Sequence, residues 1–180
     1  MRIVAGSAKG IRLAPVPDGT RPLADRAREG LFSSLGDAVR EAAVLDLFAG
    51  TGAVAIEALS RGAATAVLVD AGSRAVRTAA ENLERTHLAD RARVVRMDAA
   101  AAVRSGMGEF DLVFLDPPYD IPERALDDLL GEIAAHGAVA RGGLVVVTRP
   151  IKSSIPVIPV DWSSDRRLSY GDAVVLVYMA

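Results

Sequence analysis

The feature that most constrains the fold is an alternation of strand-like and helix-like segments that begins near residue 43. Apolar runs of strand length lie at 42–48, 64–70, 92–98, 110–116 and 143–148. Each run is nearly continuous in hydrophobicity, as expected for parallel strands whose two faces are both covered by helices. Segments with helical periodicity separate several of them, at 53–62, 73–86 and 122–137. We therefore expect an α/β fold with a doubly wound, Rossmann-like sheet.

The two ends of the chain flank this alternating region. Residues 1–24 contain two short apolar segments around a glycine-containing turn, which predicts a β-hairpin arm, and a helix is expected near 25–36. At the other end, the apolar segments 154–160 and 173–180 predict a terminal antiparallel hairpin. We expect a single domain over 1–180, with the arm at 1–24 and the core at 25–180.

The composition excludes several classes of protein. With 51% hydrophobic and 24% charged residues, the chain can bury the core of one domain. No apolar run approaches the roughly 18 residues of a membrane span, and the first ten residues lack a signal-peptide pattern, so we expect a cytoplasmic protein. The chain has no cysteine and only two histidines, His87 and His136, which speaks against disulfides and against a metal site. We expect a monomer without bound metal.

The net charge of −2 hides an uneven distribution of charges. Residues 1–40 carry seven basic and four acidic side chains, whereas residues 41–148 carry ten basic and sixteen acidic ones. A basic segment on an acidic body is typical of an arm that grips a nucleic-acid backbone, although solvated surface charge gives the same pattern. The candidate residues for contact with a nucleic-acid backbone are Lys9, Arg12, Arg21, Arg26 and Arg28.

A glycine-rich turn follows the first apolar run, between Asp46 and Ala55. Gly50 and Gly52 let the backbone pass close to a ligand, and the following helix offers unpaired amides at its N-terminus. The turn also satisfies the G-x-G-x-x-A pattern of dinucleotide-binding proteins, and Asp70 lies where such proteins carry an acid for the ribose. A nicotinamide-dependent enzyme is therefore an alternative interpretation of this turn. Because the Asp46 carboxylate would repel a pyrophosphate and attract the ammonium group of a methionine moiety, S-adenosylmethionine is favoured.

Acidic residues stand at the ends of four strand-like runs: Asp46, Asp70, Asp98 and Asp116. The carboxyl ends of parallel strands meet at the edge where open α/β sheets bind ligands. Asp70 can accept hydrogen bonds from ribose hydroxyls and Asp98 from the adenine amino group, although an aspartate here can instead cap the next helix. The candidate cofactor-binding residues are Asp46, Phe48, Ala49, Gly50, Thr51, Gly52, Asp70, Ala71, Asp98 and Ala99.

The run 110–116 continues directly into Asp116-Pro117-Pro118-Tyr119, the most specific motif of the chain. An exocyclic amine on a nucleobase is a poor nucleophile because its lone pair is delocalised into the ring. The Asp116 carboxylate and the Pro117 carbonyl can accept its two N–H hydrogens and direct the nitrogen at a methyl donor. The paired prolines, Pro117 and Pro118, stiffen the turn, and Tyr119 offers a ring face for base stacking. These four residues are the candidate catalytic set; a proline-terminated strand with a buried tyrosine is the alternative.

The chain resembles a known family over essentially its whole length. The matching stretches lie at 2–17, 21–35, 45–63 and 114–119. They are similar to the RsmD family, bacterial methyltransferases that modify guanine N2 in 16S ribosomal RNA. The resemblance implies a class I S-adenosylmethionine-dependent methyltransferase fold of seven strands, the last antiparallel. It also implies a substrate presented by the 30S subunit or its assembly intermediate rather than by naked RNA.

One stretch both matches and departs from the family pattern. It matches at Arg21, Pro22, Asp25, Arg26, Arg28 and Glu29, where the family approaches both cofactor and RNA. It departs at Leu23 and Ala24, which stand where threonines are common. A hydroxyl contact with the methionine carboxylate of the cofactor is therefore lost at these two positions.

The motifs leave other functions open. Nothing in Asp-Pro-Pro-Tyr separates guanine from adenine, so an adenine-N6 methyltransferase acting on RNA or DNA is the main alternative. An NAD(P)-dependent oxidoreductase is more distant, because no acid or base that would position a hydride is found. A non-catalytic RNA-binding module would be expected to lose the glycine turn or the Asp-Pro-Pro-Tyr motif, and this chain keeps both.

Overall fold

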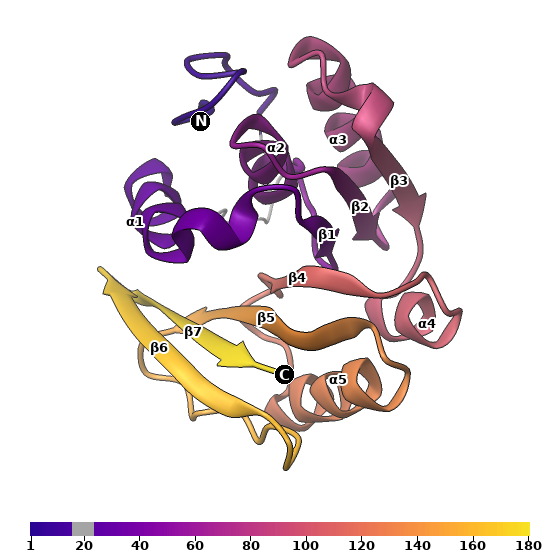
Figure 1. Ribbon diagram of the computed structural model, residues 1–180, viewed down its shortest axis with the longest axis vertical. Coiled ribbons are helices and arrows are strands. Elements are labelled where there is room, and N and C mark those ends of the chain that lie inside the picture. Colours follow the sequence, from indigo (N-terminus) through magenta and orange to yellow (C-terminus); the bar gives the residue numbers. More distant parts are fainter. Residues whose placement is uncertain (16–23) are drawn as a thin grey trace.

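The protein is built around one seven-stranded sheet. The structure, a computed structural model, describes residues 1–15 and 24–180. The strands are β1 (Ala43–Asp46), β2 (Thr65–Asp70), β3 (Ala92–Arg96), β4 (Phe110–Leu115), β5 (Val139–Pro150), β6 (Ser163–Tyr170) and β7 (Ala173–Met179). Their order across the sheet is β3-β2-β1-β4-β5-β7-β6 (Figure 1). Strands β1 to β5 pair in parallel, whereas β7 is antiparallel to both β5 and β6, so the predicted doubly wound sheet with an antiparallel last strand is confirmed.

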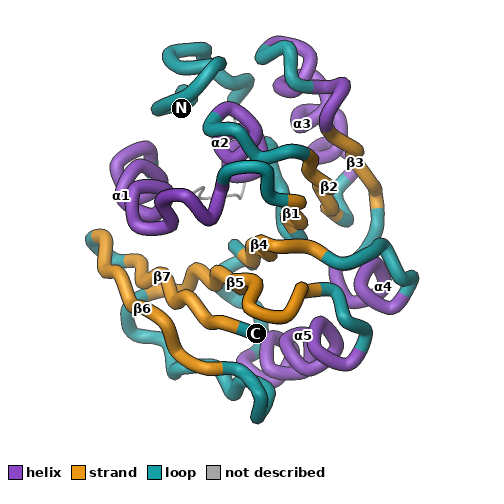
Figure 2. Tube along the Cα trace, in the orientation of Figure 1, coloured by secondary structure: helices purple, strands orange, loops and turns teal. Residues whose placement is uncertain are grey.

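Helices cover both faces of the sheet (Figure 2). One face carries α1 (Asp25–Leu35), α2 (Ala53–Ser60) and α3 (Ser73–Arg85), and the other carries α4 (Ala99–Arg104) and α5 (Glu123–Ala135). Short 3₁₀ turns lie at Gly36–Val39 and Ala89–Arg91. No helix within the described ranges is long and apolar enough to cross a membrane.

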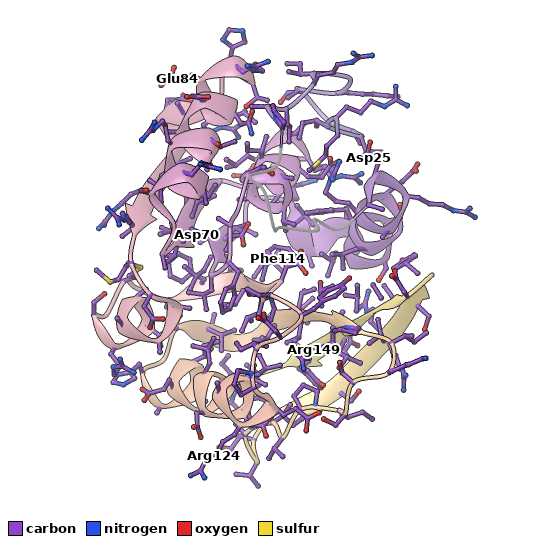
Figure 3. All side chains as sticks on the ribbon, turned by 180° about the vertical axis from the view of Figure 1, so that it is seen from behind. Asp25, Asp70, Glu84, Phe114, Arg124 and Arg149 are labelled. Carbon is purple, nitrogen blue, oxygen red and sulfur yellow. The ribbon has the colours of Figure 1, made fainter. Side chains whose placement is uncertain are left out.

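Alternate residues of the central strands supply two separate hydrophobic cores. Val44 of β1 and Leu112 of β4 face α1, α2 and α3, whereas their neighbours Leu45 and Val113 face α4 and α5. Because successive residues of a strand face opposite sides of the sheet and both sides are buried, the strand segments are continuously hydrophobic in sequence. Phe114 lies in the interior of the molecule (Figure 3), with its ring centroid 5.8 Å from that of Phe32 in α1. The helix before the sheet is therefore packed directly on the central strand β4.

The N-terminal segment forms a hairpin that is tied to the body of the molecule. Its antiparallel pairing is reduced to one bridge, between Arg2 and Arg12. The amides of Val4 and Ala5 donate hydrogen bonds to the two carboxylate oxygens of Glu57 in α2, at 2.8 and 3.0 Å. Residues 16–23, which include the predicted contact residue Arg21, lie outside the described part of the chain.

The predicted strand at 154–160 is wrong. That segment is an irregular loop, and the hairpin partner of β7 is instead the polar stretch Ser163–Tyr170, which forms β6. Pro156 and Pro159 have no N–H group to donate to a ladder, which disfavours pairing. Strand β6 is one edge of the sheet. Its first three residues are exposed and half-buried residues alternate with exposed ones after them, so no continuous apolar run marks it.

Candidate active site

The glycine turn lies where β1 ends and α2 begins. Gly50 and Gly52 adopt positive φ angles of 55° and 78°, in the left-handed region that favours glycine, and Gly52 caps α2. A Cβ atom added at Gly52 would lie 2.9 Å from Cδ2 of Leu68 in β2. The turn therefore packs closely against β2, and a side chain at position 52 would displace the turn from this strand.

Asp70, the last residue of β2, anchors the glycine turn. Its Oδ2 accepts a hydrogen bond from the amide of Gly50 at 2.9 Å, and its Oδ1 accepts one from the amide of Gly72 at 2.8 Å. The amide of Ala49 is bonded to the carbonyl of Val69 at 3.0 Å, which adds a second tie to β2. Each carboxylate oxygen has further lone pairs, so Asp70 retains the capacity to accept from hydroxyl groups.

A third anchor of the turn is Asn82 of α3, which is fully buried. Its Nδ2 donates to the carbonyl of Thr51 at 2.9 Å, and its Oδ1 accepts from the amide of Ala14 in the N-terminal hairpin at 2.6 Å. One side chain therefore links the turn, α3 and the hairpin. This role could not be predicted from the sequence, because an asparagine inside an amphipathic helix has no signature that separates it from a surface residue.

Asp46 is a buried carboxylate at the centre of the site. It is 1% exposed, and the amides of Phe48 and Ala55 hydrogen-bond to it and lower its pKa. Burial and the nearby charges of Asp116 and Asp70 outweigh them and raise the pKa of Asp46 to about 7. Among the described residues, no group hydrogen-bonds to its Oδ2. An ammonium group placed there would satisfy this atom, so the site fits the methionine end of S-adenosylmethionine.

Asp98, which follows β3, caps the next helix, as the alternative interpretation of this residue predicted. Asp98 is exposed and is the N-cap of α4, and its Oδ1 accepts from the amide of Ala101 at 3.1 Å. Ala99 is buried beneath this cap, whereas Ala71, after β2, is exposed. Contact of these residues with an adenine stays a prediction.

The Asp-Pro-Pro-Tyr loop leaves the sheet beside the glycine turn. Strand β4 pairs with β1, with Phe114 opposite Asp46, so Asp116 emerges two residues beyond that pair. This is the switch point of the sheet, where the strand order reverses between β1 and β4 and where open α/β folds bind ligands. Pro117 is buried, and Tyr119 is 39% exposed. The alternative of a buried structural tyrosine is therefore wrong.

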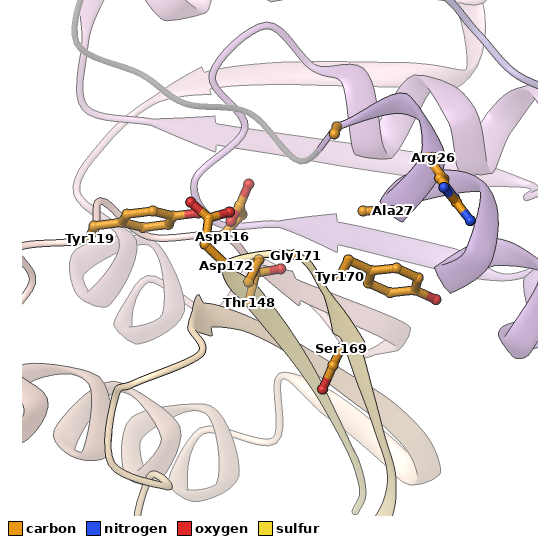
Figure 4. A pocket seen from close by; sticks show the side chains of 11 residues that line it. Arg26, Ala27, Asp116, Tyr119, Thr148, Ser169, Tyr170, Gly171 and Asp172 are labelled. Atoms are coloured by element: carbon orange, nitrogen blue, oxygen red, sulfur yellow. The ribbon is translucent and has the colours of Figure 1, made fainter.

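A cavity of about 640 Å³ opens next to this loop (Figure 4). It is lined by the start of α1, the Asp-Pro-Pro-Tyr loop, the end of β5 and the turn between β6 and β7: Ala24, Arg26, Ala27, Asp116, Tyr119, Thr148, Ser169, Tyr170, Gly171, Asp172 and Ala173. In Figure 4, Asp116, Tyr119 and Asp172 lie at one end, whereas Arg26 and Tyr170 lie toward the other. Its volume is that of a typical small-ligand pocket and accommodates a nucleobase.

The far wall of the cavity is fixed by contacts between α1 and the β6–β7 hairpin. Gly30 of α1 touches Tyr170 so closely that a Cβ atom there would lie 2.3 Å from the phenolic oxygen. Nη1 of Arg166 in β6 donates to the backbone carbonyl of Ser34, and it lies 3.1 Å from the Ser34 hydroxyl. This wall could not be predicted from the sequence, because its parts are brought together only by tertiary packing.

The prediction that Arg28 contacts RNA is wrong. The side chain is fully buried, its Nε lies 3.4 Å from Oε2 of Glu57, and its Nη2 lies 3.0 Å from Oδ1 of Asp25. It also donates to the backbone carbonyl of Arg2. Asp25 lies at the start of α1 (Figure 3), so Arg28 holds together α1, α2 and the N-terminal hairpin.

The other described basic candidates are placed on the surface. Lys9 and Arg12 are exposed on the N-terminal hairpin, and Arg26 is exposed at the cavity. Their contact with RNA stays a prediction. Within residues 1–15 and 24–180, no group of three or more His, Cys, Asp or Glu side chains is arranged to hold a metal ion.

Solved structures share this architecture. The Escherichia coli protein yhhF is 35% identical, covers 99% of this chain and 97% of its own, and superposes with a TM-score of 0.87. An RNA methyltransferase from Salinibacter ruber, solved with S-adenosyl-L-homocysteine, has the same fold at 19% identity and a TM-score of 0.65, over 88% of this chain and 93% of its own. The fold and the site define a class I S-adenosylmethionine-dependent methyltransferase.

The sequence identifies the family more closely. The family described as "Conserved hypothetical protein 95" matches residues 1–179. Ribosomal RNA small subunit methyltransferase D of Escherichia coli is 34% identical over 180 residues, which cover 99% of this chain and 89% of that protein. YlbH of Bacillus subtilis is 35% identical over 182 residues and covers 99% of this chain and 98% of its own. The chain belongs to this family, the RsmD family, as the sequence resemblance predicted.

Proposed function

We propose that this protein transfers a methyl group from S-adenosylmethionine to the exocyclic N2 of a guanine in 16S ribosomal RNA, within the 30S subunit or its assembly intermediate. The relative in Escherichia coli is a ribosomal RNA small subunit methyltransferase, which supports the class of substrate. The observation that carries the chemistry is the cavity at the switch point, because Asp116 and Tyr119 both line it.

The aspartates at the carboxyl ends of the strands indicate which part of the cofactor binds where. Across the sheet, β3, β2, β1 and β4 are consecutive, so Asp98, Asp70, Asp46 and Asp116 follow one another along that edge. In this proposal Asp98 lies by the adenine, Asp70 accepts from the ribose hydroxyls and Asp46 pairs with the ammonium group. Bound S-adenosylmethionine supplies a methyl group activated by its positively charged sulfur.

The Asp-Pro-Pro-Tyr loop prepares the amine for attack. The Asp116 carboxylate and the Pro117 carbonyl accept the two N–H hydrogens and hold the nitrogen with its lone pair toward the methyl group. Tyr119, exposed in the cavity, stacks on the base and contributes about 1–3 kcal/mol toward the cost of turning it out of the RNA. Methyl transfer leaves an acidic ammonium, so a strongly tuned general base is not needed.

The RNA backbone is held by exposed cations at two places. Arg26 lines the cavity, and in this proposal it contacts a phosphate next to the target nucleotide. Lys9 and Arg12 extend a basic surface on the N-terminal hairpin, and Arg21 belongs to the adjoining stretch of sequence. Phosphate contacts of this kind fix the register of the protein on RNA without selecting the base.

Substitution of Asp116 tests this assignment. We expect Asp116→Ala to lower kcat about 100-fold or more, since one of the two fixed acceptors is lost, and to leave the affinity for S-adenosylhomocysteine within a few fold. The measurements are methyl transfer under saturating cofactor and titration calorimetry. Asp120→Ala, three positions beyond Pro117 and outside the cavity lining, is the matched control and should retain normal turnover. Undiminished methylation by Asp116→Ala would overturn the mechanism.

A further inference from the structure

A second carboxylate, that of Asp172, lines the cavity together with that of Asp116. Asp172 comes from the β6–β7 turn, which neither the glycine turn nor the Asp-Pro-Pro-Tyr motif includes. Figure 4 shows it at the end of the cavity where Asp116 and Tyr119 lie. An acidic side chain next to the site of a bound base has only acceptor atoms to offer, which restricts the base edges that suit it.

The β6–β7 turn holds Asp172 in a defined place. Tyr170 pairs with Ala173, so the turn has two residues, and Gly171 stands first with a φ of 60°, as type II′ hairpins require. The backbone carbonyl of Asp172 accepts from the amide of Ile151 at 2.8 Å, which attaches the turn to the end of β5. The contact of Tyr170 with Gly30 fixes it from the other side. The carboxylate is thus carried by a short, anchored turn.

Guanine and adenine differ at the edge that such a carboxylate would meet. Guanine presents the N1–H donor beside its 2-amino group, whereas N1 of adenine is an acceptor beside a 6-amino group. Asp116 and the Pro117 carbonyl account for the hydrogens of the reacting amine, which leaves N1–H to be met by a further acceptor. Thr148, also in the cavity lining, has a hydroxyl that both donates and accepts and therefore does not discriminate by itself.

We propose that Asp172 is the residue that selects guanine over adenine, by accepting a hydrogen bond from guanine N1–H while Asp116 engages the 2-amino group. The inference rests on the proposed function and adds a specificity residue to it. A carboxylate facing the acceptor N1 of adenine would leave two unpaired acceptors in contact, which disfavours that base by about 10- to 100-fold.

The test uses 2,6-diaminopurine, which carries the same 2-amino group as guanine but has an acceptor at N1. Small subunits are reconstituted with guanine or 2,6-diaminopurine at the methylated position, and kcat/KM is measured for each. The wild-type protein should prefer guanine by about tenfold or more. Asp172→Asn, whose amide can donate to an acceptor N1, should reduce this preference at least about tenfold or reverse it. Asp161→Asn, an exposed aspartate outside the cavity lining, is the matched control and should keep the wild-type preference.

The outcomes separate the two proposals. If the wild-type protein makes N2-methylguanosine but accepts both bases equally, or if Asp172→Asn keeps the wild-type preference, the role of Asp172 is overturned and the proposed function stands. If the wild-type protein methylates only adenine, both fail. Thermal unfolding and S-adenosylhomocysteine affinity show whether Asp172→Asn is folded, and equal wild-type use of the two bases overturns the role of Asp172 even if that variant is not.

Discussion

At the scale of single residues, Asp46 shows how burial prepares a binding site. A carboxylate that is 1% exposed, has an oxygen without a hydrogen-bond partner among the described residues and lies near two other acids is costly to ionise. A bound ammonium group would relieve that cost. Asp46 therefore lowers the stability of the ligand-free protein and raises its affinity for a cationic ligand, a combination that is common at functional sites.

The titration of Asp46 predicts how ligand affinity depends on pH. Because its pKa is about 7 in the free protein, only about one carboxyl in ten is ionised at pH 6. We expect S-adenosylhomocysteine, whose amino group stays protonated, to bind about tenfold more weakly at pH 6 than at pH 8, as measured by titration calorimetry. Asp46→Asn should bind weakly with no such pH dependence. Equal wild-type affinity at the two pH values would contradict the pairing of Asp46 with the ammonium group.

The same residue sets the sign of a stability effect. The folded-state pKa of about 7 lies above the ordinary value of 3.8, so the folded protein binds more protons between these pH values and its free energy of unfolding falls as pH rises through that window. Denaturant unfolding of the ligand-free protein at several pH values measures this slope. Asp46→Asn should flatten it, and an unchanged slope would remove Asp46 as its cause.

At the scale of secondary-structure elements, burial decided what the sequence could predict. The five parallel strands and the glycine turn were predictable because strands covered on both faces must be continuously apolar. Strand β6 was not, because an edge strand with one open side alternates polar and half-buried residues. Four candidate site acids were likewise predictable from their places at strand ends, whereas Asp172 enters the site only through the packing of a hairpin turn against α1.

Arg28 is the clearest case of a residue whose role the sequence concealed. A charged residue in a short helix is ordinarily solvated, but here α1, α2 and the N-terminal hairpin enclose it with Glu57. We expect Arg28→Ala to lower the free energy of unfolding by about 3 kcal/mol, at the lower end for a broken buried pair, because Glu57 keeps Arg61 as a partner. Urea unfolding measures this, with exposed Arg26→Ala as a control expected to change it by less than about 0.5 kcal/mol. A loss below about 1 kcal/mol for Arg28→Ala would show that the pair does not hold the elements together.

At the scale of the whole molecule, charge is separated between the basic N-terminal segment and the acidic body. The exposed cations of that segment, Lys9 and Arg12, are therefore expected to make much of the salt-dependent contact with RNA. Arg28 does not belong to this basic surface, since its side chain is buried. We therefore expect a smaller electrostatic footprint than the sequence suggested, centred on the exposed cations of the hairpin and on Arg26 at the cavity.

The salt dependence of RNA binding tests this distribution of charge. Lys9→Gln and Arg12→Gln should each weaken binding to 16S RNA and reduce the slope of log affinity against log salt by about 1. Filter binding between low and physiological salt measures that slope. Arg141→Gln, which removes an exposed cation of β5 outside the cavity lining, should leave it unchanged. An unchanged slope for both hairpin variants would return these residues to ordinary solvated surface.

The identity of the modified nucleoside tests the proposed methylation of guanine N2 most directly. Labelled S-adenosylmethionine is offered to 30S subunits that lack the modification, with free 16S RNA and duplex DNA alongside, and the product is digested to nucleosides and separated. We expect N2-methylguanosine, formed from the ribosomal particle. N6-methyladenosine in its place would contradict the assignment of base and of Asp172, and label found only in DNA would contradict the substrate altogether.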